Sequence, residues 1–184
     1  MNAGNQMRSL ILLIGLASIT MIADQQSGSA QNQVAQQQVG WVNDVRGMRH
    51  FSGLRCPDIV GSLFRTKVLA ADADRMAGCV YTGDHGFKAI LRQHLSGTSQ
   101  KAAEHFQSAY KSAGFSQISL SGAAESGISF KTRDWTANTL CETLWRFSGR
   151  KADYTLWMSY LLPSQEADVG PAVAAFTNIL TSQN

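Results

Sequence analysis

Apolar and polar residues alternate along most of residues 62–162, which is the pattern of β-strands. The alternation predicts strands over Ser62–Ala70, over AGCVYT and FKAILRQHL, and over four later segments: FSQISLSG, ESGISFKTRD, TANTLCETLWRFSG and ADYTLWMSYLLP. Short polar segments such as GDHG and GRKAD separate these runs, and their Gly and Asp residues favour tight turns. Strands joined by short turns are antiparallel, so the pattern predicts an antiparallel sheet.

Two segments carry apolar residues at helical spacing instead. The first helix is predicted at about 98–113 and ends at Gly114, since glycine readily takes the left-handed conformation that ends many helices. The second is predicted at about 169–181. Asp168 places a negative charge at its positive end, and Pro171 fits its first turn.

This order of strands and helices predicts an α+β fold, with one antiparallel sheet of about six to seven strands packed with two main helices. We expect the single domain to span 41–184, a length typical of one domain. The closing stretch YTLWMSYLLPSQEADVGPAVAAFTNIL, residues 154–180, resembles the end of the PsbP-like fold, in which an antiparallel sheet lies between helices. The resemblance covers less than a fifth of the chain and implies a fold without an activity.

The N-terminus has the pattern of a secretory signal peptide. Arg8 precedes the apolar run LILLIGLASITMIA, and small residues follow, so cleavage is expected after Ala30 or, as the second choice, after Ala23. The run of 14 residues is shorter than the roughly 20 that a bilayer-spanning helix needs. We therefore predict a signal peptide at 1–30, a glutamine-rich flexible leader at 31–40, and a periplasmic or secreted mature chain without a membrane span.

If the protein is exported, a disulfide is expected among its three cysteines, because thiols pair in oxidising compartments. We favour a disulfide between Cys56 and Cys79, since Cys56 ends an extended segment and Cys79 lies in a strand one hairpin later. The sequence alone leaves the other two pairings open. Cys141 is then a free thiol, and its apolar strand neighbours Trp145 and Phe147 predict that it is buried.

The common catalytic and ligand-binding motifs are absent from the sequence. It contains no H-E-x-x-H, C-x-x-C, G-x-S-x-G, G-x-G-x-x-G or G-x-x-x-x-G-K-[ST] pattern, and it therefore predicts no metal site, no cofactor and no catalytic residue. A formal net charge of +3 is too small for a nucleic-acid footprint. The polar cluster at Asp84 and His85 is interpreted as the tip of a hairpin.

One cationic strand face predicts binding. Lys88, Arg92 and His94 share a face of FKAILRQHL and would suit an anionic ligand, and Trp135 in the RDWTAN loop is a candidate interface anchor. The alternative is a solvated sheet face whose cations keep the strand from pairing with other chains.

Together these patterns predict an exported, non-enzymatic binding or accessory protein of the cell envelope. Its partner would be an anionic envelope component or another envelope protein. Two alternatives remain open. One is an exported hydrolase with an unrecognised site, in which His85 or His94 lies beside a nucleophile. The other is a structural subunit of an envelope assembly, which requires a contiguous exposed apolar patch.

Overall fold

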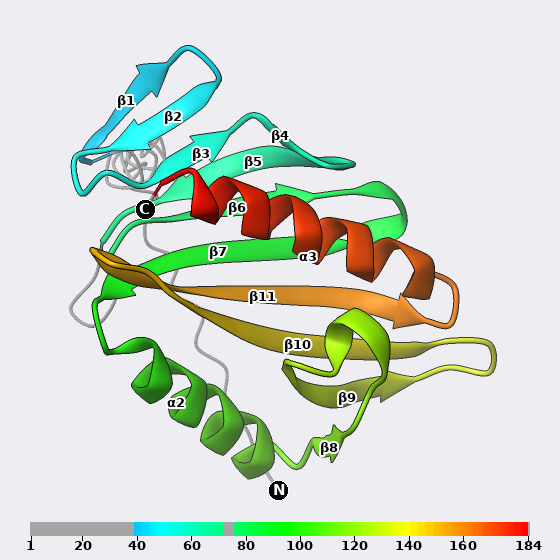
Figure 1. The fold of residues 1–184 in the computed structure, drawn as a ribbon. Helices are drawn as coiled ribbons and strands as arrows, with labels where there is room; N and C mark the ends of the chain where they lie inside the picture. Colours follow the sequence, from blue (N-terminus) through cyan, green and yellow to red (C-terminus); the bar gives the residue numbers. More distant parts are fainter. Residues whose placement is uncertain (1–38, 72–75, 184) are drawn as a thin grey trace, which may run out of the picture.

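The computed structural model describes residues 39–71 and 76–183, which form two antiparallel sheets and two long helices in one α+β domain (Figure 1). The predicted signal peptide and residues 31–38 of the predicted leader lie outside the described residues.

The larger sheet has eight strands in the order β4-β5-β6-β7-β11-β10-β9-β8, and all neighbouring pairs are antiparallel. Both edge strands are short, which limits pairing with other chains. The prediction of about six to seven strands omitted β4, whose two residues are too few to show alternation. The strands are β4 (Ile59–Val60), β5 (Leu63–Leu69), β6 (Gly78–Thr82), β7 (Lys88–Leu95), β8 (Ser116–Ile118), β9 (Ile128–Asp134), β10 (Thr139–Ser148) and β11 (Ala152–Leu162).

A second sheet of three strands corrects the prediction of a single sheet. It consists of β1 (Trp41–Asp44), β2 (Gly47–His50) and β3 (Arg55–Pro57), which are too short for a clear periodic signal. The predicted disulfide is present: Cys56 of β3 is bonded to Cys79 of β6, and both residues are fully buried. This disulfide covalently links the small sheet to the main sheet.

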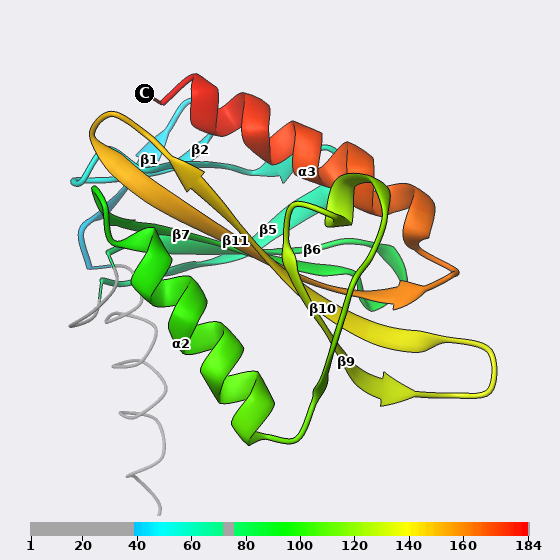
Figure 2. The same cartoon turned by 60° about the horizontal axis from the view of Figure 1, so that its bottom comes forward.

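The two helices cover opposite sides of the main sheet, with α2 (Ser99–Ser112) on one side and α3 (Glu166–Thr181) on the other (Figure 2). The helix predicted at 169–181 begins three residues earlier, at Glu166, so Pro171 is its sixth residue and does not lie in the first turn. Two hydrogen bonds close the turn before the helix: the Gln165 side chain accepts from the Leu161 amide (2.7 Å), and the Gln165 amide donates to the Leu161 carbonyl (2.8 Å). Among the described residues, no helix combines the length and apolarity that crossing a membrane requires.

Each helix has its own apolar cluster. Phe176 of α3 lies edge-on to Tyr81 of β6, with ring centroids 5.2 Å apart, and Val169, Ala172 and Leu180 extend this core. On the other side, α2 packs Ala103, Phe106 and Tyr110 against Phe130, Leu144 and Trp157 of β9, β10 and β11. Strand β7, which carries the predicted cationic face, lies beyond this second cluster, next to β11.

Candidate functional site

The predicted cationic residues of β7 lie on one side of the sheet, the same side as α2. Lys88 is exposed. Arg92 is half-buried, and its Nη1 donates hydrogen bonds to the carbonyl oxygens of Ala70 (3.0 Å) and Met76 (3.1 Å). Arg92 therefore joins the two ends of the connection between β5 and β6, a structural role that its strand position did not reveal.

His94 is only 2% exposed, and its Nε2 lies 2.8 Å from the Thr155 hydroxyl on β11. The residue opposite His94, Asp153, accepts hydrogen bonds from the Ser99 amide (3.2 Å) and hydroxyl (2.9 Å). These buried contacts fix the start of α2 on the sheet. With 2% of its surface exposed, His94 is closed to a ligand from solvent.

Trp135 lies at the tip of the β9–β10 hairpin and is 48% exposed. The Arg133 guanidinium lies 5.5 Å from the centre of its ring, a cation–π contact. Two strands, β11 and β10, lie between β7, which carries Lys88, and β9, which precedes Trp135. The structure does not bring these two predicted site residues together.

A continuous surface does surround Lys88. Cross-strand pairing places Lys67 beside Val80, Val80 beside Ile90, and Thr82 between Phe64 and Lys88. The apolar members Val80 and Ile90 are half-buried, whereas Phe64 is 57% exposed and both lysines are exposed. We call this surface the open sheet face; it consists of Phe64, Lys67, Val80, Thr82, Lys88 and Ile90.

Sequence reasoning missed Lys67. Strict alternation along β5 places Lys67 on the same side as Leu63 and Arg65, which face α3. A register shift between Arg65 and Lys67 turns Lys67 to the other side. No periodic signal in the sequence marks this bulge.

A carboxylate lies next to the open sheet face, but its oxygens are already engaged. Glu142 of β10 accepts hydrogen bonds from the Tyr110 hydroxyl, from the Trp157 indole (3.2 Å) and from the Thr132 hydroxyl (3.5 Å). Burial, and then the hydrogen bond to Glu142, raise the pKa of Tyr110 above its ordinary value. This cluster anchors α2 and forms the boundary between α2 and the open sheet face.

A histidine and a serine lie in contact in the small sheet, away from His85 and His94, the residues that the hydrolase alternative names. His50 is 1% exposed, and its Nδ1 lies 2.8 Å from the Ser52 hydroxyl. However, the Ser52 amide donates to the same nitrogen (3.2 Å), and the Ser52 hydroxyl donates to Gln93. These hydrogen bonds hold the turn between β2 and β3 in place. His50 lines neither of the cavities described below. The arrangement gives a Ser–His nucleophile no support.

The polar cluster at Asp84 and His85 is a hairpin tip, as interpreted from the sequence. His85 is exposed, with φ of 51°, and Gln165 holds the turn by donating to the carbonyl oxygens of Asp84 (3.2 Å) and His85 (3.4 Å). Cys79 faces the core, so it does not meet these residues. Within the described ranges, no three His, Cys, Asp or Glu side chains come together as metal ligands would.

Cys141 is a buried free thiol, as predicted. Burial is the main reason that its pKa rises to about 11, with a smaller effect of the Asp134 carboxylate. A thiol with this pKa is almost fully protonated at neutral pH and is a poor nucleophile.

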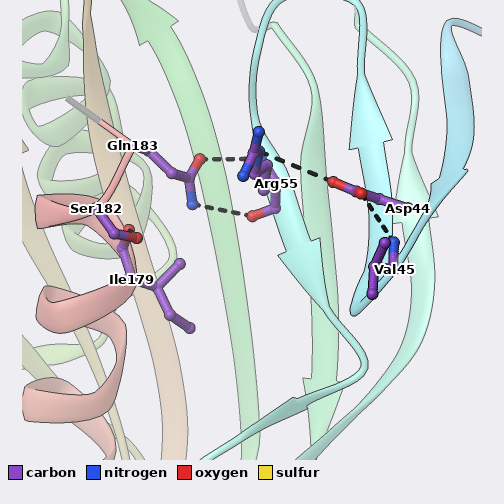
Figure 3. Close-up of polar contacts among 6 residues, drawn as sticks. All are labelled: Asp44, Val45, Arg55, Ile179, Ser182 and Gln183. Carbon is purple, nitrogen blue, oxygen red and sulfur yellow. Dashed lines mark hydrogen bonds and ion pairs between the residues drawn. The ribbon is translucent and has the colours of Figure 1, made fainter.

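The described residues form cavities on the α3 side of the molecule. The smaller, of about 230 Å³, lies between the start of α3 and the 3₁₀ turn η2 (Gly122–Ala124). The larger, of about 450 Å³, lies between the small sheet and the end of α3 (Figure 3). We call the larger one the C-terminal groove; its lining includes Asp44, Arg46, Gly47, Arg55, Ile179, Ser182 and Gln183. Sequence reasoning missed it because three segments far apart in the chain form it.

Comparisons with known proteins do not assign the chain: no family model, no curated protein and no solved structure matches it.

Proposed function

We propose that this protein is an exported, non-enzymatic binding or accessory protein of the cell envelope, and that it binds an anionic partner through the open sheet face. The supporting observation is the pairing of Lys67 and Lys88 with a half-buried apolar row on one uninterrupted strand surface. Apolar area supplies affinity and the lysines supply steering toward negative charge.

The charges around this surface favour an anionic partner. Glu142, the neighbouring carboxylate, is occupied by three donors from the protein itself. The lysine ammonium groups project from strand positions whose neighbours are Val80, Ile90 and Thr82, which carry no charge. An acidic surface placed here would meet two cations without a competing acid on the same strands.

Export and a periplasmic or secreted location belong to the same proposal. The signal-like N-terminus suggests it, and the buried Cys56–Cys79 disulfide supports it, because such bonds persist in oxidising compartments. Fractionation of the native cell with an antibody against the domain would test it. Recovery of the protein in the cytosol with Cys56 and Cys79 reduced would contradict it.

The binding surface is tested with a polyanion as the probe. The exported protein is bound to heparin resin, and the salt concentration at elution is compared between wild type and K67E/K88E. The matched control is K101E/K111E, which makes the same charge change on exposed lysines of α2. We expect the sheet-face variant to elute at clearly lower salt than the control variant, because local charge decides retention.

Equal elution of the two variants would show that retention follows net charge alone and would remove the open sheet face as the binding surface. The melting temperature of each variant serves as the folding control, since all four lysines are exposed.

A further inference from the structure

The C-terminal groove carries an excess of positive charge. Arg46, in the turn between β1 and β2, and Arg55, on β3, both line it. Asp44 is the acidic side chain of this lining, and its Oδ2 lies 3.8 Å from Arg55 Nε (Figure 3). One carboxylate at this distance offsets part of the charge of two guanidinium groups.

A third arginine, Arg49, lies beside Arg55 but outside the lining of the groove. Arg49 of β2 is paired in register with Arg55 of β3, so two like charges lie directly opposite each other on neighbouring strands. Such a pair is destabilising by itself. Within residues 39–71 and 76–183, the guanidinium groups of Arg46 and Arg49 have no hydrogen bond or ion pair. An anion bound at Arg55 would reduce the repulsion between Arg55 and Arg49.

The other polar groups of the groove are already satisfied by the protein. The Ser182 hydroxyl donates to the Ile179 carbonyl (2.7 Å), and the Gln183 side chain is bonded to the backbone of Arg55. Ser182 and Gln183 therefore do not compete for the arginine donors, and Asp44 is the acceptor side chain that does. Gly47 forms part of its lining: a Cβ there would lie 2.2 Å from the Cys56 carbonyl oxygen, so no side chain at this position fits against β3.

We infer that the C-terminal groove binds the phosphate group of an anionic ligand through Arg46 and Arg55. Planar guanidinium forks match the oxygens of phosphate, and a volume of about 450 Å³ lies within the range of small-molecule sites, about 300–1,000 Å³. The inference does not depend on the proposed function, because the groove lies on the α3 side and the open sheet face on the α2 side.

The phosphate can come from a soluble ester or from the headgroup of a phospholipid. Val45, beside Arg46 at the rim, is 97% exposed, and an apolar tip next to a cation suits a lipid surface. The two sources share one chemistry at the groove, and the experiment has one arm for each.

In the first arm, inorganic phosphate is titrated into the exported protein while the side-chain Nε–H signals of its arginines are followed by NMR. In the second arm, the protein is co-sedimented with vesicles of phosphatidylglycerol and phosphatidylcholine (1:3), and with vesicles of phosphatidylcholine alone. We expect R46Q/R55Q to bind at least about tenfold more weakly than wild type in the arm that shows binding, since two charge-assisted contacts are lost.

The matched control is R133Q/R146Q, which removes two exposed arginines from β9 and β10 and should bind as wild type does. The single variant R46Q is included because it should fold normally, since the Arg46 side chain has no partner among the described residues. K67E/K88E should also bind phosphate normally, which separates this site from the open sheet face.

Phosphate-induced shifts of the Arg46 and Arg55 signals would indicate that the ligand is a soluble phosphate compound. Sedimentation only with the phosphatidylglycerol vesicles would indicate that the ligand is a phospholipid headgroup. Either result supports the site. The inference would be overturned if wild type bound neither phosphate nor phosphatidylglycerol vesicles, or if R133Q/R146Q lost as much binding as R46Q/R55Q.

Discussion

Gln183 forms with Arg55 the two hydrogen bonds that a neighbouring β-strand would form. Its Oε1 accepts from the Arg55 amide (2.9 Å) and its Nε2 donates to the Arg55 carbonyl (3.0 Å), as Figure 3 shows. Pro57, the next outward position of β3, has no amide hydrogen, and its carbonyl accepts from the Tyr81 hydroxyl (3.1 Å). The β3 edge of the small sheet is therefore closed to other chains.

Replacing Gln183 by Ala should open this edge. We expect hydrogen exchange at the Arg55 amide to accelerate about fivefold, which corresponds to the loss of about 1 kcal/mol of local stability. The control is S182A, whose hydroxyl bonds within the end of α3 and not to β3. Unchanged exchange at Arg55 in Q183A would show that the side-chain amide does not protect the edge.

Removal of the disulfide should destabilise the whole domain. The bond joins residues 23 positions apart, and the chain-entropy model assigns about 3 kcal/mol to a loop of this length. We expect C56A/C79A to lower the free energy of unfolding in urea by that amount. C141A, which removes a buried thiol outside the bond, should cost less. Equal losses in the two variants would contradict this assignment.

The thiol of Cys141 should be inert while the domain is folded. Its pKa of about 11 and its burial in β10 leave almost no accessible thiolate at pH 8. A thiol reagent such as dithionitrobenzoate should therefore react in urea and not in buffer. Rapid reaction in buffer would show that the β10 core opens readily.

Acid should weaken the domain through His50. Burial lowers the pKa of His50 below its ordinary 6.5, so the unfolded chain binds this proton more strongly than the folded one. Stability from this group is present above about pH 6.5 and is lost as the pH falls below it. The urea midpoint should drop between pH 7 and 5, and H50N should flatten the change. If the urea midpoint of H50N depended on pH as strongly as that of wild type, the pH dependence would come from other groups.

The cluster at Glu142 should couple α2 to the sheet. Y110F removes one donor to the Glu142 carboxylate, and we expect a loss of about 1–2 kcal/mol. A double-mutant cycle with E142Q isolates the pair, and a coupling energy near zero would contradict it. Because burial and Glu142 raise the Tyr110 pKa above 10, stability from this hydroxyl should be present below about pH 10 and lost at higher pH.

The sequence predicted much of this architecture because its strongest signals are local. Strands β5 to β11 alternate over several residues or border clear turns, and α2 has an apolar face, so each was found. The Cys56–Cys79 bond followed from the same strand order. The strands of the small sheet have three or four residues, and a segment of this length is too short for the alternation of polar and apolar residues to distinguish a strand from a loop.

The candidate sites were less accessible to sequence reasoning, because contacts between distant segments define them. Lys88, Arg92 and His94 lie on one side of β7, but Arg92 is bonded to Ala70 and Met76 and His94 is buried against Thr155. These partners come from other strands and from the β5–β6 connection. The C-terminal groove likewise exists only once α3 lies beside β3.

The disulfide also changes what a protease can release. Cys56 and Cys79 flank β4, β5 and the connection to β6, so one cut anywhere between the two cysteines leaves both fragments covalently joined. A nicked molecule would run as an intact chain on a non-reducing gel and as two bands after reduction. Samples judged whole by mass under oxidising conditions can therefore contain cleaved chains.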